Sequence, residues 1–186
     1  MAVDRAAAEG AILAFLRAIG RDPAREPELQ GTPARVTEAY LKDLCSGYER
    51  DPADVVRPHL IEGSTAIVSL RDIEVTTMCP HHLMPALGLG AIAFRPRGKL
   101  VGLGVLADLL DVVSRRLILQ EEIGERVATT LAAELDARWV ACRLALTHSC
   151  MTARGERKHG ARAETFAFVG DSSDRAEALS VVAGRS

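Results

Sequence analysis

Apolar positions recur along this chain with two different periods, which separate the predicted helices from the predicted strands. Over 4–19, and again from 32 to 47, they recur every three or four residues, as on an amphipathic helix. Two further helices are predicted over 105–116 and 121–135 for the same reason. Residues 48–63, which lie between the two helix pairs, read as a mainly polar loop.

The period changes to two over 66–77, 87–94, 139–150 and 162–169, so these segments are predicted strands. The order along the chain is two helices, two strands, two helices and two strands. This order indicates an α+β fold, with an antiparallel four-stranded sheet covered on one face by two helices and preceded by N-terminal helices. The two edges of such a sheet are open to further pairing, so we expect the chain to form an oligomer.

The chain of 186 residues has the length of one domain with an N-terminal appendage. We expect an N-terminal helical region over 1–63 and a catalytic domain over 64–170. The remaining residues, 171–186, are small and polar, and we expect a polar C-terminal tail that is loose or weakly helical.

Composition narrows the classes of function. The net charge is −2 and the basic residues are dispersed, which argues against a nucleic-acid partner. The chain has no apolar run of 18 residues and no secretory signal, so we expect no membrane partner. Its four cysteines do not have the spacing of a disulfide framework. A cytoplasmic enzyme that uses thiolates as metal ligands is therefore expected.

Two separated segments carry residues suited to one metal ion. Cys79 and His82 are three positions apart across a proline, and His148 and Cys150 are two apart on a predicted strand, where such residues share a face. A Cys-His-Cys set offers Zn²⁺ three ligands and leaves a fourth position free for water, which is the arrangement of catalytic sites. His81 and His148 would then be available to move protons.

Less specific interpretations exist for each of these residues. Either cysteine alone fits a core thiol, as Cys142 does within the apolar face of the predicted strand 139–150. A structural zinc site would need a fourth protein ligand, and His81 or His148 could supply it. Gln120 and Glu121 fit the polar start of a helix, where an acid interacts favourably with the helix dipole.

These candidate site residues belong to motifs through which the chain resembles the GTP cyclohydrolase I family, from about residue 31 to residue 170. Each shared motif is weak alone, but their order and separations together are specific. The motifs are G-T-P-x-R-V (31–36), C-x-H-H (79–82), V-G-L-G (101–104), L-Q-E (119–121), T-H-S-C-M (147–151) and A-R-G (153–155).

The resemblance implies a tunnelling (T-) fold assembled as a toroidal homo-oligomer, a decamer of two pentameric rings. It implies a zinc cofactor held by Cys79, His82 and Cys150, with His81 and His148 as catalytic proton-transfer residues. The family reaction is a hydrolysis of C–N bonds in a cyclic amidine. It opens the imidazole ring of GTP at C8, releases formate and forms 7,8-dihydroneopterin triphosphate, a step of pterin biosynthesis.

The resemblance also implies a set of substrate contacts. Glu121, with Gln120 beside it, matches the carboxylate that grips the guanine edge, and Leu103 is expected to contact the substrate. Arg154 and Arg35 match arginines that hold the triphosphate, with Arg35 supplied by a neighbouring subunit.

Several positions depart from the family pattern. Cations or a serine expected at the triphosphate are replaced by Val105, Asp108, Gly104, Glu38 and Thr152. An acid beside a triphosphate is unfavourable. One alternative is therefore a paralogue that applies the same zinc chemistry to an unphosphorylated purine-like or other N-heterocycle. Another alternative is a non-catalytic zinc-binding ring protein.

Overall fold

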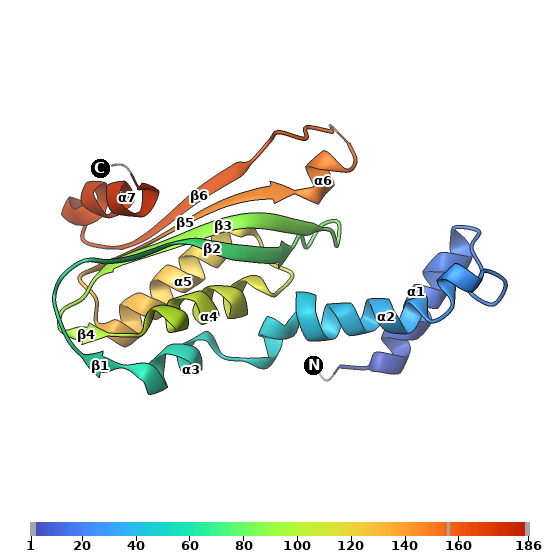
Figure 1. The fold of residues 1–186 in the computed structure, drawn as a ribbon, viewed down its shortest axis with the longest axis horizontal. Helices are drawn as coiled ribbons and strands as arrows, with labels where there is room; N and C mark the ends of the chain where they lie inside the picture. The colour runs from blue at the N-terminus through green and yellow to red at the C-terminus, as the bar shows by residue number, and fades with distance from the viewer. Residues whose placement is uncertain (1–2, 156, 185–186) are drawn as a thin grey trace. The chain divides into compact units, whose positions relative to one another are not determined.

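Four strands form an antiparallel sheet in the order β2-β3-β5-β6 (Figure 1). They are β2 (Val68–Met78), β3 (Pro85–Arg95), β5 (Trp139–His148) and β6 (Ala163–Gly170). The period-two pattern predicted all four, and the α+β class with its antiparallel sheet is confirmed. Because each neighbouring pair is antiparallel, β2 and β5 run in the same direction. Their carboxyl ends therefore lie at the same end of the sheet.

One face of the sheet is covered by α4 (Leu103–Ser114) and α5 (Gln120–Leu135), as predicted from their apolar stripes (Figure 1). Both helices bury the residues that recur every three or four positions. These residues meet the inward-facing side chains of the sheet in the main hydrophobic core, which includes Ile92, Phe94, Leu106, Leu109, Leu110, Ile123, Val127, Leu131, Val140, Cys142 and Leu144.

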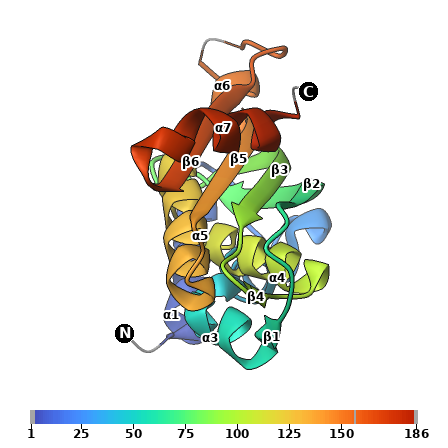
Figure 2. The same ribbon diagram turned by 90° about the vertical axis from the view of Figure 1, so that its left-hand side faces the viewer.

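The opposite face of the sheet carries α7 (Arg175–Ala183), which Figure 2 shows across the strands from α4 and α5. Ala178 and Val182 of this helix are buried against the sheet. The tail from Asp171, expected to be loose or weakly helical, thus contains a helix that packs on the sheet. Small side chains four positions apart let the helix approach the sheet closely, and the guanidinium of Arg138 donates two 2.8 Å hydrogen bonds to Asp174 just before it.

Residues 48–63 are more ordered than a polar loop. They contain α3 (Pro52–Val56) and β1 (Ile61–Glu62), which pairs with β4 (Lys99–Leu100). Val55 and Val56 are buried in the main core. The apolar pairs Val55-Val56 and Leu60-Ile61 were the signal that the loop interpretation missed, because two residues are too few to show a period.

The structure describes residues 3–155 and 157–184 and divides into two units between Ser46 and Gly47. The first unit contains α1 (Arg5–Ala18) and α2 (Thr32–Glu38), followed by a π-helical turn over Ala39–Leu44. The sheet and its covering helices belong to the second unit. Among the described helices, none is both long enough and apolar enough to cross a membrane.

Candidate active site

Three metal-ligating side chains meet where β2 and β5 end. Cys79 and His82 lie in the turn that follows β2, and Cys150 follows β5. The Sγ atoms of both cysteines and a ring nitrogen of His82 all lie within 4.8 Å of one another. β2 and β5 run in the same direction, so their carboxyl ends lie at the same end of the sheet, which brings these distant segments together.

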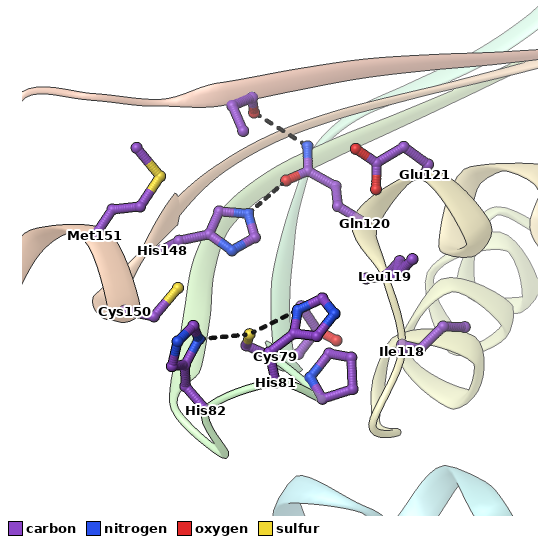
Figure 3. A pocket seen from close by; sticks show the side chains of 13 residues that line it. Cys79, His81, His82, Ile118, Leu119, Gln120, Glu121, His148, Cys150 and Met151 are labelled. Atoms are coloured by element: carbon purple, nitrogen blue, oxygen red, sulfur yellow. Dashed lines mark hydrogen bonds between the residues drawn. The ribbon is translucent and has the colours of Figure 1, made fainter. Parts of the chain in front are cut away.

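Cys150 reaches the cluster from a helix and not from a strand. The strand predicted to extend to Cys150 ends at His148, and α6 (Ser149–Thr152) begins directly after it. The shared strand face expected for His148 and Cys150 is therefore wrong. The helical turn changes the direction of the chain, so Cys150 lies beside His82 in the cluster, while the ring of His148 lies beside Gln120 (Figure 3).

The turn that carries Cys79 and His82 is closed by backbone hydrogen bonds. The Leu83 N–H donates to the Cys79 carbonyl at 2.9 Å, and the Cys79 N–H donates to the Met84 carbonyl at 2.9 Å. Leu83 has a φ of 51°, a left-handed conformation that is uncommon for a residue with a Cβ atom. The surrounding hydrogen bonds hold that conformation, and with it the direction of the two ligands.

The donor set and its spacing fit zinc. Bonds of about 2.0–2.3 Å to a tetrahedral zinc place ligand atoms about 3.5–3.8 Å apart, and the Cys79 Sγ lies 3.6 Å from the His82 Nδ1. Burial and the neighbouring Cys79 thiol raise the pKa of Cys150, while Arg154 opposes this shift. A divalent cation would relieve the repulsion between two thiolates.

Within residues 3–155 and 157–184, this is the group of His, Cys, Asp and Glu side chains spaced to hold a metal ion, and it has three members. His81 is close, with its Nδ1 3.9 Å from the Cys79 Sγ, but neither His81 nor His148 belongs to the group. Three protein ligands leave a coordination position for water or substrate, as in catalytic zinc sites.

A cavity of about 260 Å³ opens beside the cluster. Its walls come from the turn after β2, the segment that leads into α5, and the end of β5 (Figure 3). The lining residues include Cys79, His81, His82, Ile118, Leu119, Gln120, Glu121, His148, Cys150 and Met151. The structure thus brings seven of the sequence-predicted site residues to one cavity.

The histidine at the end of β5 lies in a half-buried position. Burial lowers the pKa of His148, and the nearby carboxylate of Glu121 acts in the opposite direction. The His148 Nε2 lies 2.8 Å from the Oε1 of Gln120. The side chain is thus held against one wall of the cavity in an environment that favours its neutral form.

Three predicted substrate contacts are not among the residues that line the cavity. Leu103 is exposed at the start of α4, and Arg154 follows α6, close enough to Cys150 to affect its pKa. Arg35 belongs to the first unit, where its guanidinium donates to Thr32 Oγ1 at 3.0 Å. The roles of these residues stay predictions.

Sequence reasoning assigned no site role to Thr77, Ile118 or Met151, which also line the cavity. Ile118 directly precedes the L-Q-E motif, and Met151 follows Cys150, so adjacency to predicted site residues was the available signal. Thr77 faces the cavity from the last part of β2, which only the register of the sheet reveals.

The two acids that replace expected cations are each paired with an arginine. Asp108 accepts two hydrogen bonds of 2.7 Å from the guanidinium of Arg50, and this pairing lowers the pKa of Asp108. Glu38 forms an ion pair with Arg5 inside the first unit. Neither carboxylate is an isolated negative charge.

Comparison with known proteins agrees with this site. Residues 8–183 match the family model of GTP cyclohydrolase I. The GTP cyclohydrolase 1 of Corynebacterium glutamicum (strain R) is 39% identical over 97% of this chain and 94% of its own length. That of Streptomyces griseus is 39% identical over 99% and 93%, and that of Rhodopirellula baltica is 40% identical over 97% and 80%. This chain therefore belongs to the GTP cyclohydrolase I family.

Proposed function

We propose that this protein is a zinc-dependent cyclohydrolase that opens the imidazole ring of GTP at C8. Water attacks C8, which leaves as formate. The ribose carbons then rearrange and close the dihydropterin ring of 7,8-dihydroneopterin triphosphate. The single observation that carries the proposal is the meeting of Cys79, His82 and Cys150 beside a cavity that also holds two further histidines and an acid. Family membership and the names of the relatives support the same reaction.

The three ligands have the chemistry to hold zinc and leave it accessible from the cavity. When bound, zinc supplies the Lewis acidity that activates water for attack on a poorly electrophilic carbon. The T-fold of the family carries the three ligands on the turn after β2 and on α6, which follows β5 at the same end of the sheet. Cys79 and Cys150 supply the negative charge, and the preformed turn after β2 directs His82 toward them.

Glu121 is suited to recognise the guanine ring. It stands in the first turn of α5 and lines the cavity. A carboxylate there can accept the two adjacent N–H donors of guanine at once, a contact that adenine cannot reproduce. We propose that Glu121 selects guanine and orients C8 toward the metal cluster.

His81 and His148 line the same cavity and can exchange protons with the substrate. Opening the imidazole ring requires a proton for the departing ring nitrogen and removal of a proton from the attacking water. Imidazole side chains do both near neutral pH. We propose that these two histidines share the proton transfers at C8 and its neighbouring nitrogens.

The charge pattern is compatible with a triphosphate. The alternative of an unphosphorylated substrate depended partly on Asp108 and Glu38, and both are offset by arginines. Val105 and Thr152 replace expected lysines with neutral residues, and Gly104 replaces a serine, so these positions weaken the attraction for phosphate without adding repulsion. Arg154 and Arg35 remain the proposed triphosphate contacts. The four positions without an expected cation, Val105, Asp108, Glu38 and Thr152, lead us to expect weaker binding of the triphosphate than a fully cationic site would give.

A non-catalytic ring protein is less well supported. A structural zinc site needs a fourth protein ligand, and the group among the described residues has three. The shape of the site, with a cavity beside the open coordination position, also favours a bound substrate.

We also propose that the enzyme is a cytoplasmic homodecamer. GTP cyclohydrolase I proteins are usually oligomeric, and both edge strands of this sheet, β2 and β6, lack a partner among the described strands. Large apolar side chains near the site, including Leu87, Leu119 and Met151, are exposed in the single chain. Light scattering should give a mass of about ten chains, and a monomer would contradict this part of the proposal.

A formate-release assay tests the proposed reaction. Zinc-loaded protein should release formate from GTP and give a fluorescent pterin after oxidation, with guanosine as the matched substrate that lacks phosphates. Turnover of guanosine with no turnover of GTP would favour the unphosphorylated alternative. Absence of product from both would contradict the cyclohydrolase proposal.

A further inference from the structure

The carboxamide of Gln120 is buried and fully engaged inside the protein. Gln120 is 4% exposed. Its Nε2 lies 3.0 Å from the Ala163 carbonyl oxygen, 3.3 Å from the Leu144 carbonyl oxygen and 3.2 Å from the Thr165 hydroxyl. Its Oε1 lies 2.8 Å from the His148 Nε2.

These partners determine which end of the carboxamide faces which neighbour. Backbone carbonyl oxygens only accept hydrogen bonds, so the group that faces Leu144 and Ala163 must be the NH₂ group. The reverse orientation would place the Gln120 oxygen against two carbonyl oxygens inside the protein, which is strongly unfavourable. The oxygen of Gln120 therefore faces His148.

The orientation of Gln120 in turn determines the state of His148. An amide oxygen accepts and cannot donate, so the His148 nitrogen that faces it must carry a hydrogen. In neutral imidazole, one nitrogen is protonated and the other is an acceptor. With the hydrogen on Nε2, the lone pair is on Nδ1, and Figure 3 shows this second nitrogen turned toward the side of the cavity where Cys79 and Cys150 lie.

We propose that Gln120 is a positioning residue that holds His148 as the Nε2–H tautomer and leaves its Nδ1 as the proton acceptor facing the cavity. The catalytic part of this inference rests on the proposed function, but the tautomer does not. Gln120 then acts through His148, and the guanine edge is left to Glu121. Two main-chain carbonyls, one in β5 and one at the start of β6, hold the Gln120 carboxamide in this orientation.

The choice of an amide has a chemical consequence. A carboxylate in this place would orient the imidazole and also stabilise its protonated form, as aspartate does in a Ser-His-Asp triad. A neutral amide orients the ring without adding negative charge. Gln120 therefore orients His148 without the added stabilisation of an imidazolium that a carboxylate would give.

Nitrogen NMR of the zinc-loaded full chain tests the tautomer without substrate. With ¹⁵N-labelled histidine, the chain gives signals from five histidines, and the His148→Gln variant identifies those of His148. We expect an N–H shift for Nε2 and an acceptor shift for Nδ1 of His148. In Gln120→Met, which keeps the length of the side chain but removes the acceptor, the two nitrogens should move toward a mixture of tautomers.

Thr165→Val is the matched control, because it removes one of three acceptors of the Gln120 NH₂ group and leaves both carbonyls. Its His148 signals should match those of the wild-type chain. An Nδ1–H tautomer in the wild-type chain, or His148 signals in Gln120→Met that are unchanged, would overturn the proposal. Neither result depends on turnover of GTP.

Kinetics separates positioning from direct substrate binding. Gln120→Met should lower kcat for GTP by about 10- to 100-fold with little change in KM, as is typical when a supporting hydrogen bond is lost. The same change in a His148→Ala background should have almost no further effect on kcat, because the two residues act as one unit. A rise in KM with kcat unchanged, or additive losses, would show that Gln120 does not act through His148.

Discussion

At the scale of single residues, two cysteines on neighbouring stretches of chain show how position determines chemistry. Cys142 lies in the middle of β5 within the core, and burial raises the pKa of its thiol to about 12. Cys150 lies eight residues further on, past the end of the strand and beside Cys79. The first thiol can only pack, and the second can ligate a metal once a cation favours its thiolate.

Replacing each of these cysteines with alanine tests that distinction. Cys150→Ala should lose bound zinc and formate release, because two protein ligands do not retain the ion. Cys142→Ala should keep one zinc per chain and lose only about 1 kcal/mol of stability to a small core cavity. Metal content by mass spectrometry and formate release would be measured on both, and full zinc occupancy in Cys150→Ala would contradict the assigned ligands.

Two adjacent glutamates in the first turn of α5 allow an equally close comparison. Glu121 lines the cavity, whereas Glu122 forms an ion pair with Arg126 on the helix surface. Glu121→Gln should lower kcat/KM for GTP by roughly 10- to 100-fold, since a charged hydrogen-bond acceptor contributes about 1.5–3 kcal/mol. Glu122→Gln should stay within about threefold of the wild-type value. Equal effects in steady-state assays would argue against recognition of guanine by Glu121.

The sequence revealed some of these residue roles and not others. Residue spacing together with the family motifs predicted that Cys79, His82 and Cys150 share a metal site, although Cys150 reaches it from a helix. Alternation along the strand was enough to predict that Cys142 packs. The internal bonding of Gln120 and the Arg50–Asp108 pair were not predictable. Each depends on the contact of segments more than twenty residues apart, whose relative placement no local pattern contains.

At the scale of elements, α7 is the clearest addition to the predicted fold. The long helices α4 and α5 show their apolar stripes over three turns or more, so periodicity finds them. Helix α7 is short and contacts the sheet mainly through an alanine and a valine. An alanine-rich contact gives almost no periodic signal in the sequence, although it permits close approach of a helix to small side chains of the sheet such as Ala91 and Ala141.

Substituting two alanines of α7 tests whether this contact stabilises the fold. Ala178 is fully buried and Ala176 is exposed. Ala178→Asp should lower the free energy of unfolding by several kcal/mol, on the order of the cost of burying an unpaired carboxylate. Ala176→Asp should change it by less than about 0.5 kcal/mol. Urea unfolding would measure both, and equal midpoints would mean that α7 does not pack on the sheet in solution.

At the scale of the whole molecule, the core and the candidate metal site are separate. Cys79, His82 and Cys150 are not part of the main hydrophobic core, which joins the sheet to α4 and α5. The fold thus has a source of stability that does not depend on an ion. This differs from small zinc domains, in which the metal takes the place of a core.

Removing the metal should therefore abolish activity and preserve the fold. After dialysis against a chelator, formate release should disappear while far-ultraviolet circular dichroism keeps its helical and strand signals. Zinc should restore activity, and magnesium should not, because thiolates are poor ligands for that ion. Loss of secondary structure on chelation would contradict the separation of core and site.

The hydrogen-bonded turn between Cys79 and Met84 has a consequence for how the protein matures. Since the backbone itself closes this turn, the conformational entropy of ordering it is lost during folding and not when the ion arrives. Newly synthesised chains can then fold without zinc, remain inactive as apoprotein and bind zinc later. The active fraction in a cell would follow the supply of zinc. When zinc is scarce, the chain would accumulate as folded, inactive apoprotein that zinc can reactivate, and it would not be degraded.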